Sequence, residues 1–261
     1  MKQPLSFHVL GPLSVGYGGR CLDIPGAKQR ILLAALLVKF GQVVCVDELV
    51  DRIWGARPPC RPRRALHTCL TRLRHSLADL PDAPGLIRTS NAGYSVHASA
   101  ETLDFARFTD LLGRARAAGA AADLPRESAA LGEALSLWRG ERALPDVASD
   151  SLHRDVVPGM HQLRIEALER RGELELELGH HRELVGELRA LTSAHPFHER
   201  FWQQLLLALY RCGRKVEALL AYAELTSHIR EGLGVEPGPQ LRDLHLAILR
   251  DDRVPPLHTA S

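Results

Sequence analysis

Arginine is the residue type that stands out in the first hundred residues, because it gathers in one segment. Seven arginines lie between Asp51 and Asp79, and no acidic residue lies between those two positions. An arginine can donate two hydrogen bonds at once to the O6 and N7 atoms of guanine or to a phosphate. A segment this basic is typical either of a nucleic-acid contact or of a solvated helix face.

The end of this basic segment, residues 63–77, has the periodicity of an amphipathic helix. Its apolar residues recur three or four positions apart and share one stripe. An α-helix fits the major groove of DNA, so we expect the polar side of this helix to contact bases and phosphates. The apolar stripe consists of Leu66, Cys69, Leu70, Leu73 and Leu77. The DNA contacts are expected from Arg63, Arg64, His67, Thr68, Thr71, Arg72 and Arg74.

The segments before and after this helix predict further secondary-structure elements, and the order of these elements is typical of one fold. Alternating apolar residues broken by Gly and Pro predict a small antiparallel sheet in the first 25 residues. Helices are expected over 31–40 and from Asp47, a candidate N-cap, to Trp54. Residues 86–96 are typical of a β-hairpin around an Asn/Gly turn. A sheet, three helices and a hairpin, in that order, predict a winged helix over residues 1–100.

The charge of the chain is divided unequally along its length. Residues 1–100 contain 13 Lys and Arg against 6 Asp and Glu, a net charge of +7. Residues 101–261 contain 20 against 25, a net charge of −5. Such asymmetry indicates nucleic-acid interaction by the basic part. Together with the amphipathic helix and the hairpin, it favours a DNA contact over a merely solvated helix.

The rest of the chain is expected to be helical and repetitive. Gly179 and Gly213 are 34 residues apart in similar surroundings, and 34 residues is the tetratricopeptide period. That register places Trp202, Leu205, Ala218 and Tyr222 at core positions. A weaker copy is expected over 104–137 and a closing helix over 240–249. The predicted fold class is therefore mainly α with a small β part: a winged helix-turn-helix, then an all-α tetratricopeptide-like domain over 101–250, then a disordered tail over 251–261.

Motifs for catalysis or metal binding are missing from the sequence. It contains no phosphate-binding loop, no nucleophile elbow, no HExxH and no GxGxxG. The five cysteines include no CxxC pair, and the His180–His181 and His195–His198 pairs have no ligands at metal spacing. The longest apolar run, 31–38, is too short to span a bilayer. We therefore expect a cytoplasmic protein that is not an enzyme and binds no cofactor, metal or membrane.

Several segments resemble the Streptomyces antibiotic regulatory protein (SARP) family, with its bacterial transcriptional activation domain. The resemblance covers roughly residues 5–250, and its motifs occur in the expected order. The segments that carry it are AKQR at 27–30, VDEL at 46–49, IWG at 53–55, ALHTCLTRLR at 65–74, ALSLWRG at 134–140, RCGR at 211–214 and LGVEPGP at 233–239.

The resemblance implies an OmpR-type winged helix followed by three tetratricopeptide-like repeats. It also implies activation of a secondary-metabolite (antibiotic) gene cluster, through direct repeats near the −35 region and RNA polymerase holoenzyme with its sigma factor. Protomers are expected in tandem on DNA or as a homodimer. When the roles of family residues are transferred to the matching positions of this sequence, Arg72 is the candidate for a base contact, with Thr68 beside it. Arg64, Thr71 and Arg74 are candidates for phosphate contacts.

The sequence departs from the family pattern in two places. Position 69 is Cys where an aromatic residue or His is usual, which would remove one backbone contact. The wing tip at 90–93 has the sequence SNAG where RGPG is usual, and Ser90 cannot replace an arginine in a narrow minor groove. Arg88 is the candidate to compensate, and with Ser90 and Asn91 it forms the expected wing contact. We expect no receiver domain before the winged helix, so the resemblance does not imply phosphorylation control. Nor do we expect an ATPase after the helical body, as in the larger family members.

Two other hypotheses fit parts of the sequence. A repeat stack could bind a protein or peptide in its groove, with DNA binding incidental. This adaptor hypothesis predicts that residues 101–250 alone retain the biological activity. A one-component sensor would in addition bind a small ligand in the helical body, and the sequence neither supports nor excludes such a ligand.

Overall fold

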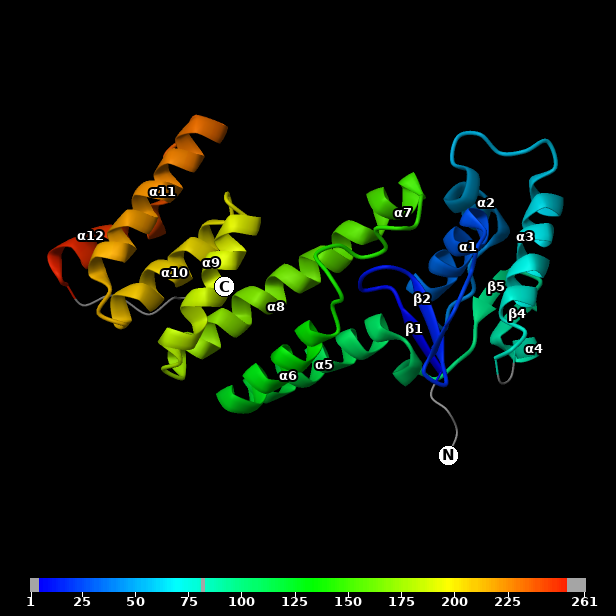
Figure 1. Cartoon of the computed structure of the whole chain (residues 1–261), viewed down its shortest axis with the longest axis horizontal. Coiled ribbons are helices and arrows are strands. Elements are labelled where there is room, and N and C mark those ends of the chain that lie inside the picture. Colours follow the sequence, from blue (N-terminus) through cyan, green and yellow to red (C-terminus); the bar gives the residue numbers. More distant parts are fainter. Residues whose placement is uncertain (1–4, 81–82, 253–261) are drawn as a thin grey trace. The chain divides into compact units, whose positions relative to one another are not determined.

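The computed structural model describes residues 5–80 and 83–252 and divides into two compact units (Figure 1). The first unit holds the described residues up to Ala115 together with Ala130–Ile165. The second holds Arg116–Ala129 together with the described residues from Glu166 onward. Among the described residues, no helix is long and apolar enough to cross a membrane.

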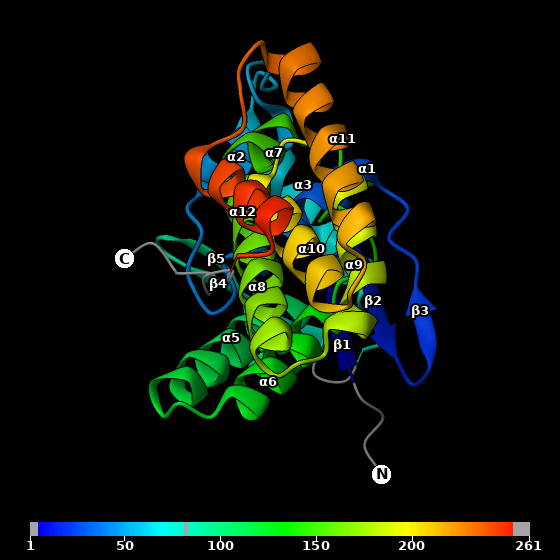
Figure 2. The same cartoon turned by 90° about the vertical axis from the view of Figure 1, so that its left-hand side faces the viewer.

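The first unit opens with the three-stranded antiparallel sheet that the alternating residues predict. Its strands lie in the order β1-β2-β3, and Figure 2 shows β3 at the edge of the sheet. Phe7 of β1 faces Val15 of β2, and both side chains are completely buried. The inner face of the sheet is therefore part of the core of this unit. The strands are β1 (Leu5–His8), β2 (Ser14–Tyr17) and β3 (Arg20–Leu22).

Three helices follow the sheet and pack against one another. The first begins at Ala27, earlier than predicted, because Arg30 N already donates to Gly26 O and closes the first turn. Asp47 is not the N-cap of the second, so that prediction was wrong. Cys45 Sγ accepts a hydrogen bond from Glu48 N instead, which leaves Asp47 in the first turn. The helices are α1 (Ala27–Val38), α2 (Val46–Trp54) and α3 (Pro62–Ser76).

A β-hairpin completes the winged helix in the predicted order. The short helix α4 (Ala83–Leu86) leads into β4 (Ile87–Ser90), which pairs with β5 (Gly93–Val96). The hairpin also pairs with the loop before α2. Val44 N donates to Tyr94 O at 2.8 Å, and Tyr94 N donates to Val44 O at 3.0 Å. These two bonds fix the wing to the helical part of the domain.

The close approach of the wing to this loop requires glycine at position 93. Gly93 has a φ of +153°, and a Cβ there would lie 2.0 Å from Val44 O. We expect Gly93→Ala to lower the free energy of unfolding by about 2–3 kcal/mol, because the wing must separate from the loop. Urea denaturation measures this change. Gly85→Ala is the control, since a Cβ at Gly85 meets nothing within 4 Å. Equal stability of the two variants would contradict the expected strain.

The first unit continues past residue 100, because the β1–β2 region is bonded to the start of α5 (Asp104–Ala120). Leu103 forms a parallel bridge with Phe7. The buried carboxylate of Asp104 accepts hydrogen bonds from Val9 N, at 2.9 Å to each oxygen, and from Leu10 N at 3.0 Å. The compact unit thus extends beyond the predicted domain boundary, and the division at residue 100 stays a prediction.

The segment after α6 (Leu124–Ser136) adds a second set of bonds to the same region. Arg139 N donates to Leu10 O at 2.8 Å, and its guanidinium donates to Pro12 O at 2.6 Å. Farther along, α7 (Asp150–Asp155) contacts α2. There Arg52 Nη1 donates to Asp155 at 2.6 Å. The sheet and α2 are therefore both tied to residues beyond the winged helix.

The helical part contains three copies of one helical hairpin, in which two helices are joined by a tight turn. This observation confirms the predicted repeats. The turns at Gly179 and Gly213 both have positive φ, +87° and +75°. In each, an amide bonds the carbonyl five residues earlier, from His180 N to Glu175 O and from Arg214 N to Leu209 O, both at 2.9 Å. Such bonds characterise a Schellman turn. The third copy joins α5 to α6, where Ala122 takes the positive-φ position and Asp123 N donates to Ala118 O at 3.0 Å.

The second unit stacks the remaining helices around a continuous core. Trp202, Leu205 and Ala218 are buried there as the repeat register predicts. Tyr222 is half-buried, and its ring stacks on His245 with 3.9 Å between centroids. The predicted disordered tail lies, from residue 253 onward, outside the described residues. The helices are the later part of α8 (Val157–Glu177), which begins in the first unit, and then α9 (His181–Ala194), α10 (Glu199–Arg211), α11 (Lys215–Leu233) and α12 (Pro239–Arg250).

Candidate nucleic-acid interface

Helix α3 presents one polar face to solvent and buries the other. Leu66, Leu70 and Leu73 are buried, and α3 packs against α1 and α2. The polar residues follow each other at helical spacing along the outer side, so they form one continuous surface. The exposed residues are Arg63, Arg64, His67, Thr68, Thr71, Arg72 and His75. The structure thus brings together six of the seven contacts predicted on this helix and leaves Arg74 half-buried.

The arginines and threonines of this face differ in what they can donate. Thr68 Oγ1 donates to Arg64 O at 3.1 Å, and Thr71 Oγ1 donates to His67 O at 3.0 Å. Both hydroxyl hydrogens are therefore used within the helix. In the described part of the chain, no hydrogen bond or ion pair engages the guanidinium groups of Arg63, Arg64 and Arg72. The guanidinium groups of these three exposed arginines are therefore able to donate to DNA.

The N-terminus of α3 adds positive potential to the same face. The helix begins with a proline in its first turn and has no acidic residue there. Backbone amides at a helix start have no partner within the helix, and the helix dipole favours an anion near them. Arg63 and Arg64 lie in this first turn. The start of α3 therefore suits a phosphate electrostatically.

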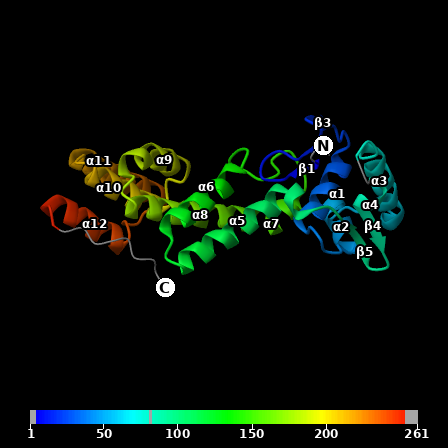
Figure 3. The ribbon, with the colours of Figure 1, turned by 90° about the horizontal axis from the view of Figure 1, so that it is seen from below.

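Arg74 connects α3 to the wing. Its Nη2 donates to Ile87 O and to Thr89 Oγ1, both at 2.9 Å. Figure 3 shows α3 beside β4, where both acceptors lie. No local pattern predicts this contact, because it joins residues 13 and 15 positions apart on two different elements. Thr89 therefore belongs to the contact between α3 and the wing, and it was not among the residues predicted from the sequence.

The remaining wing residues lie at the hairpin tip and are exposed. Arg88 is exposed on β4, with Ser90 and Asn91 following it. Ser90 Oγ donates to Gly93 O at 3.3 Å, which closes the turn. The wing thus offers one cation, Arg88, and the amide side chain of Asn91 to a ligand.

Cys69 lies at the border between the buried stripe and the exposed face. Burial raises the pKa of its thiol above the ordinary value, and the positive charges of Lys28 and Arg72 only partly oppose this effect. The side chain is therefore an uncharged thiol at neutral pH. It contributes a small apolar surface here and only a weak hydrogen-bond donor.

Two family models match successive parts of the chain. Residues 25–96 match the model "Transcriptional regulatory protein, C terminal", and residues 103–249 match "Bacterial transcriptional activator domain". The regulatory protein DnrI of Streptomyces peucetius is 34% identical over 254 residues, which cover 95% of this chain and 93% of DnrI. The chain belongs to the SARP family. Both models describe parts of transcriptional regulators, and the resemblance inferred from the motifs of this chain is confirmed.

Other members of the SARP family and its neighbours differ in length from this chain. The regulatory protein AfsR of Streptomyces coelicolor is 40% identical over 249 residues, but these cover 95% of this chain and 24% of AfsR. The chain thus spans about a quarter of that relative. A solved structure of Mycobacterium tuberculosis EmbR, in complex with a low-affinity phosphopeptide, superposes with a TM-score of 0.88 at 30% identity. It covers 97% of this chain and 67% of EmbR, which confirms the predicted winged helix followed by a helical domain.

Proposed function

We propose that this chain is a cytoplasmic, sequence-specific DNA-binding activator whose helix α3 enters the major groove. The observation that carries the proposal is the outer face of α3, where three arginines are exposed beside a wing. The dimensions of the major groove admit one α-helix, and arginine is the commonest residue in specific base contacts. In this SARP-family chain the exposed face and the wing together supply a base-reading and a backbone-binding surface.

The residues of this surface take different roles in the proposal. Arg72 reads a base, with Thr68 beside it. Arg63, Arg64, His67 and Thr71 contact phosphates, and either threonine must release its bond within the helix to donate one. Arg74 acts on DNA affinity mainly by holding the wing, because one of its terminal nitrogens is already bonded there. Arg88, Ser90 and Asn91 meet the backbone or the minor groove beside the helix.

The proposal extends to the biological setting. We infer that the chain activates a secondary-metabolite (antibiotic) gene cluster by binding direct repeats near the −35 region. It would then recruit RNA polymerase holoenzyme with its sigma factor, from protomers bound in tandem. Support comes from the similarity to AfsR and DnrI, which are regulatory proteins of Streptomyces species. Affinity selection of fragmented genomic DNA, followed by sequencing, tests it. Recovery of random fragments, lost as salt rises, would favour the adaptor hypothesis.

Two arginine substitutions separate specific from general DNA binding. Arg72→Ala is expected to cost about 1–3 kcal/mol at the selected site and to relax base preference there. Arg74→Ala is expected to weaken binding to cognate and unrelated DNA alike and to flatten the salt dependence, because the released wing loses its contacts with the DNA backbone. Both are measured by titrating labelled duplexes at several salt concentrations.

Arg114→Ala is the matched control, because Arg114 is an exposed arginine of the same unit that pairs with Asp110 on α5. It is expected to leave both affinities unchanged. Unchanged binding by the Arg72 variant would reject α3 as the recognition helix.

A further inference from the structure

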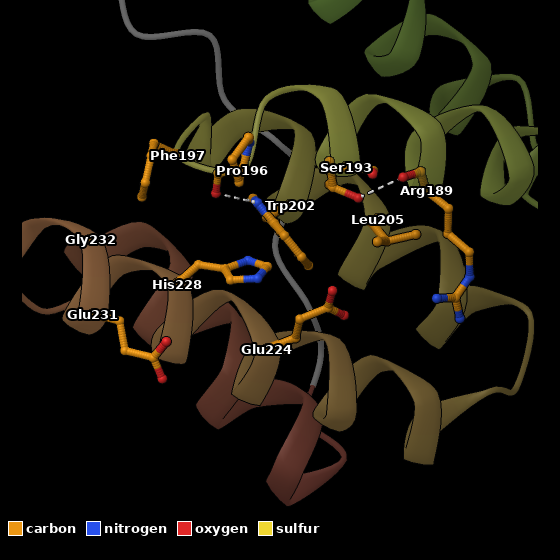
Figure 4. Close-up of a pocket in the computed structure, with 11 residues that line it drawn as sticks. Arg189, Ser193, Pro196, Phe197, Trp202, Leu205, Glu224, His228, Glu231 and Gly232 are labelled. Carbon is orange, nitrogen blue, oxygen red and sulfur yellow. Dashed lines mark hydrogen bonds between the residues drawn. The ribbon is translucent and has the colours of Figure 1, made fainter.

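The second unit contains a pocket far along the chain from the DNA-binding face. It lies between α11 and the end of α9 with the start of α10 (Figure 4). Its volume of about 640 Å³ is within the range of small-molecule sites. Pro196, Phe197, Trp202 and Leu205 line one side, and α11 supplies Glu224, His228, Glu231 and Gly232. Neither the proposed DNA contact nor the repeat architecture requires this cavity.

The apolar side of the pocket is formed by aromatic rings in fixed positions. The indole Nε1 of Trp202 donates to Pro196 O at 2.9 Å, which sets the orientation of the ring. The ring of Phe197 lies over the backbone of α11, where a Cβ at Gly232 would come within 2.7 Å of it. The Phe197 side chain is nevertheless 49% exposed. A ligand would thus find a preformed apolar surface.

The polar side of the pocket is acidic and incompletely bonded. In Figure 4 the side chains of Glu224 and His228 extend from α11 toward Trp202 and Leu205. Nδ1 of His228 is buried and has no hydrogen-bond partner among the described residues. Within the same described ranges, no hydrogen bond or ion pair engages the carboxylate of Glu224. The exposed carboxylate of Glu224 is therefore available to a ligand, whereas Nδ1 of His228 is covered by protein atoms.

Glu231 and Arg189, the other charged residues of the lining, already have hydrogen-bond partners. Glu231 accepts a hydrogen bond from Ser227 Oγ at 2.6 Å. Arg189, the basic residue of the lining, bonds Glu217 at 2.9 Å. The serine hydroxyl leaves the negative charge of Glu231 in place. The lining therefore carries two carboxylates, Glu224 and Glu231, against one arginine, and its net charge is negative.

We propose that this pocket binds a small organic ammonium ion with an aromatic or other apolar body. The ammonium group donates to the carboxylate of Glu224, while the apolar body lies against Trp202 and Phe197. Aromatic faces attract cations, which adds to the selectivity. An anion would be repelled by Glu224, and a neutral apolar molecule would desolvate that carboxylate without pairing it. Binding is independent of the DNA contact and stands whether or not α3 reads DNA.

The test uses 4-phenylbutylamine as the probe, with 4-phenylbutanol and 4-phenylbutyrate as its uncharged and anionic counterparts. Binding to the full chain is followed through the indole N–H resonance of Trp202, assigned with Trp54→Phe and Trp138→Phe variants. The amine is expected to shift this resonance saturably, with a Kd of about 1 mM for a molecule of this size. The alcohol and the acid are expected to bind about tenfold more weakly or not at all.

A matched pair of substitutions assigns the binding to the pocket. Glu224→Gln removes the charge at constant shape and is expected to weaken amine binding about tenfold. Glu183→Gln changes an exposed carboxylate of α9 outside the lining and is expected to leave the affinity unchanged. Since Glu224 is exposed, its variant should keep the native indole spectrum, which verifies that it is folded. Equal binding of amine and alcohol, equal affinity of the two variants, or an unshifted Trp202 resonance would overturn the proposal.

Discussion

Replacing Asp104 by alanine is expected to lower the free energy of unfolding by about 2–5 kcal/mol. The Asp104 side chain is 3% exposed and accepts three hydrogen bonds from two backbone amides, Val9 N and Leu10 N. Alanine would leave both buried amides without these acceptors, and no water can reach them at low cost. Urea denaturation followed by circular dichroism measures the loss.

Two further variants show whether burial is the cause. Asp104→Asn keeps one acceptor oxygen but turns an NH₂ group toward the amides, so we expect an intermediate loss. Asp110→Ala removes a carboxylate that is 60% exposed and pairs with Arg114 on the same helix. Its expected effect is about 0.5 kcal/mol or less. An Asp104 variant as stable as the Asp110 variant would show that the amides find other partners.

Replacing Glu173 by alanine is expected to cost about 3–5 kcal/mol in the second unit. Glu173 is 6% exposed and bonds two arginines, Arg170 Nη1 at 3.3 Å and Arg200 Nε at 3.0 Å. Arg170 also forms a two-bond pair with Glu127, and those hydrogen bonds raise the pKa of Arg170 above its usual range. Removing one carboxylate from such a buried network leaves its positive charges undercompensated.

The matched control is Glu187→Ala. Glu187 pairs with Arg171 through two hydrogen bonds, at 2.6 and 2.8 Å, but its side chain is 36% exposed. Solvent screens this pair, so its loss should cost less than about 1 kcal/mol. Differential scanning calorimetry on both variants gives the comparison. A loss for Glu187→Ala as large as that for Glu173→Ala would contradict the role of burial.

The sequence predicts the elements of this fold well, because their signals are local. The alternation in the first 25 residues and the hairpin at 86–96 both depend on neighbouring residues, and both were confirmed. The 34-residue spacing of Gly179 and Gly213 reflects a repeated turn, which the structure shows with the same hydrogen bond in each copy. The third copy was weaker in sequence because Ala122 occupies the position where the others have glycine.

The sequence does not predict contacts that join distant segments. Asp104 lies 95 positions from Val9, and its pattern is that of an ordinary residue at a helix start. Arg74 appeared equivalent to the other arginines of its helix, yet in the described part of the chain it is the one arginine of α3 that is bonded to the wing. The periodicity of α3 predicted which face of the helix is exposed. It did not predict the hydrogen-bond partners of the individual side chains. Whether these residues contact DNA stays a prediction.

The bonds between the winged helix and the residues after it bear on rotational phase along DNA. Asp104 and Arg139 hold the β1–β2 region, and Arg52 holds α7 to α2. With α3 seated in a groove, the azimuth of α7 around the duplex axis is therefore set by the base pair that α3 occupies. About ten base pairs complete one turn of B-DNA. Moving the operator by about five base pairs would place α7 on the opposite side of the duplex. Moving it by about ten base pairs would return α7 to the original side.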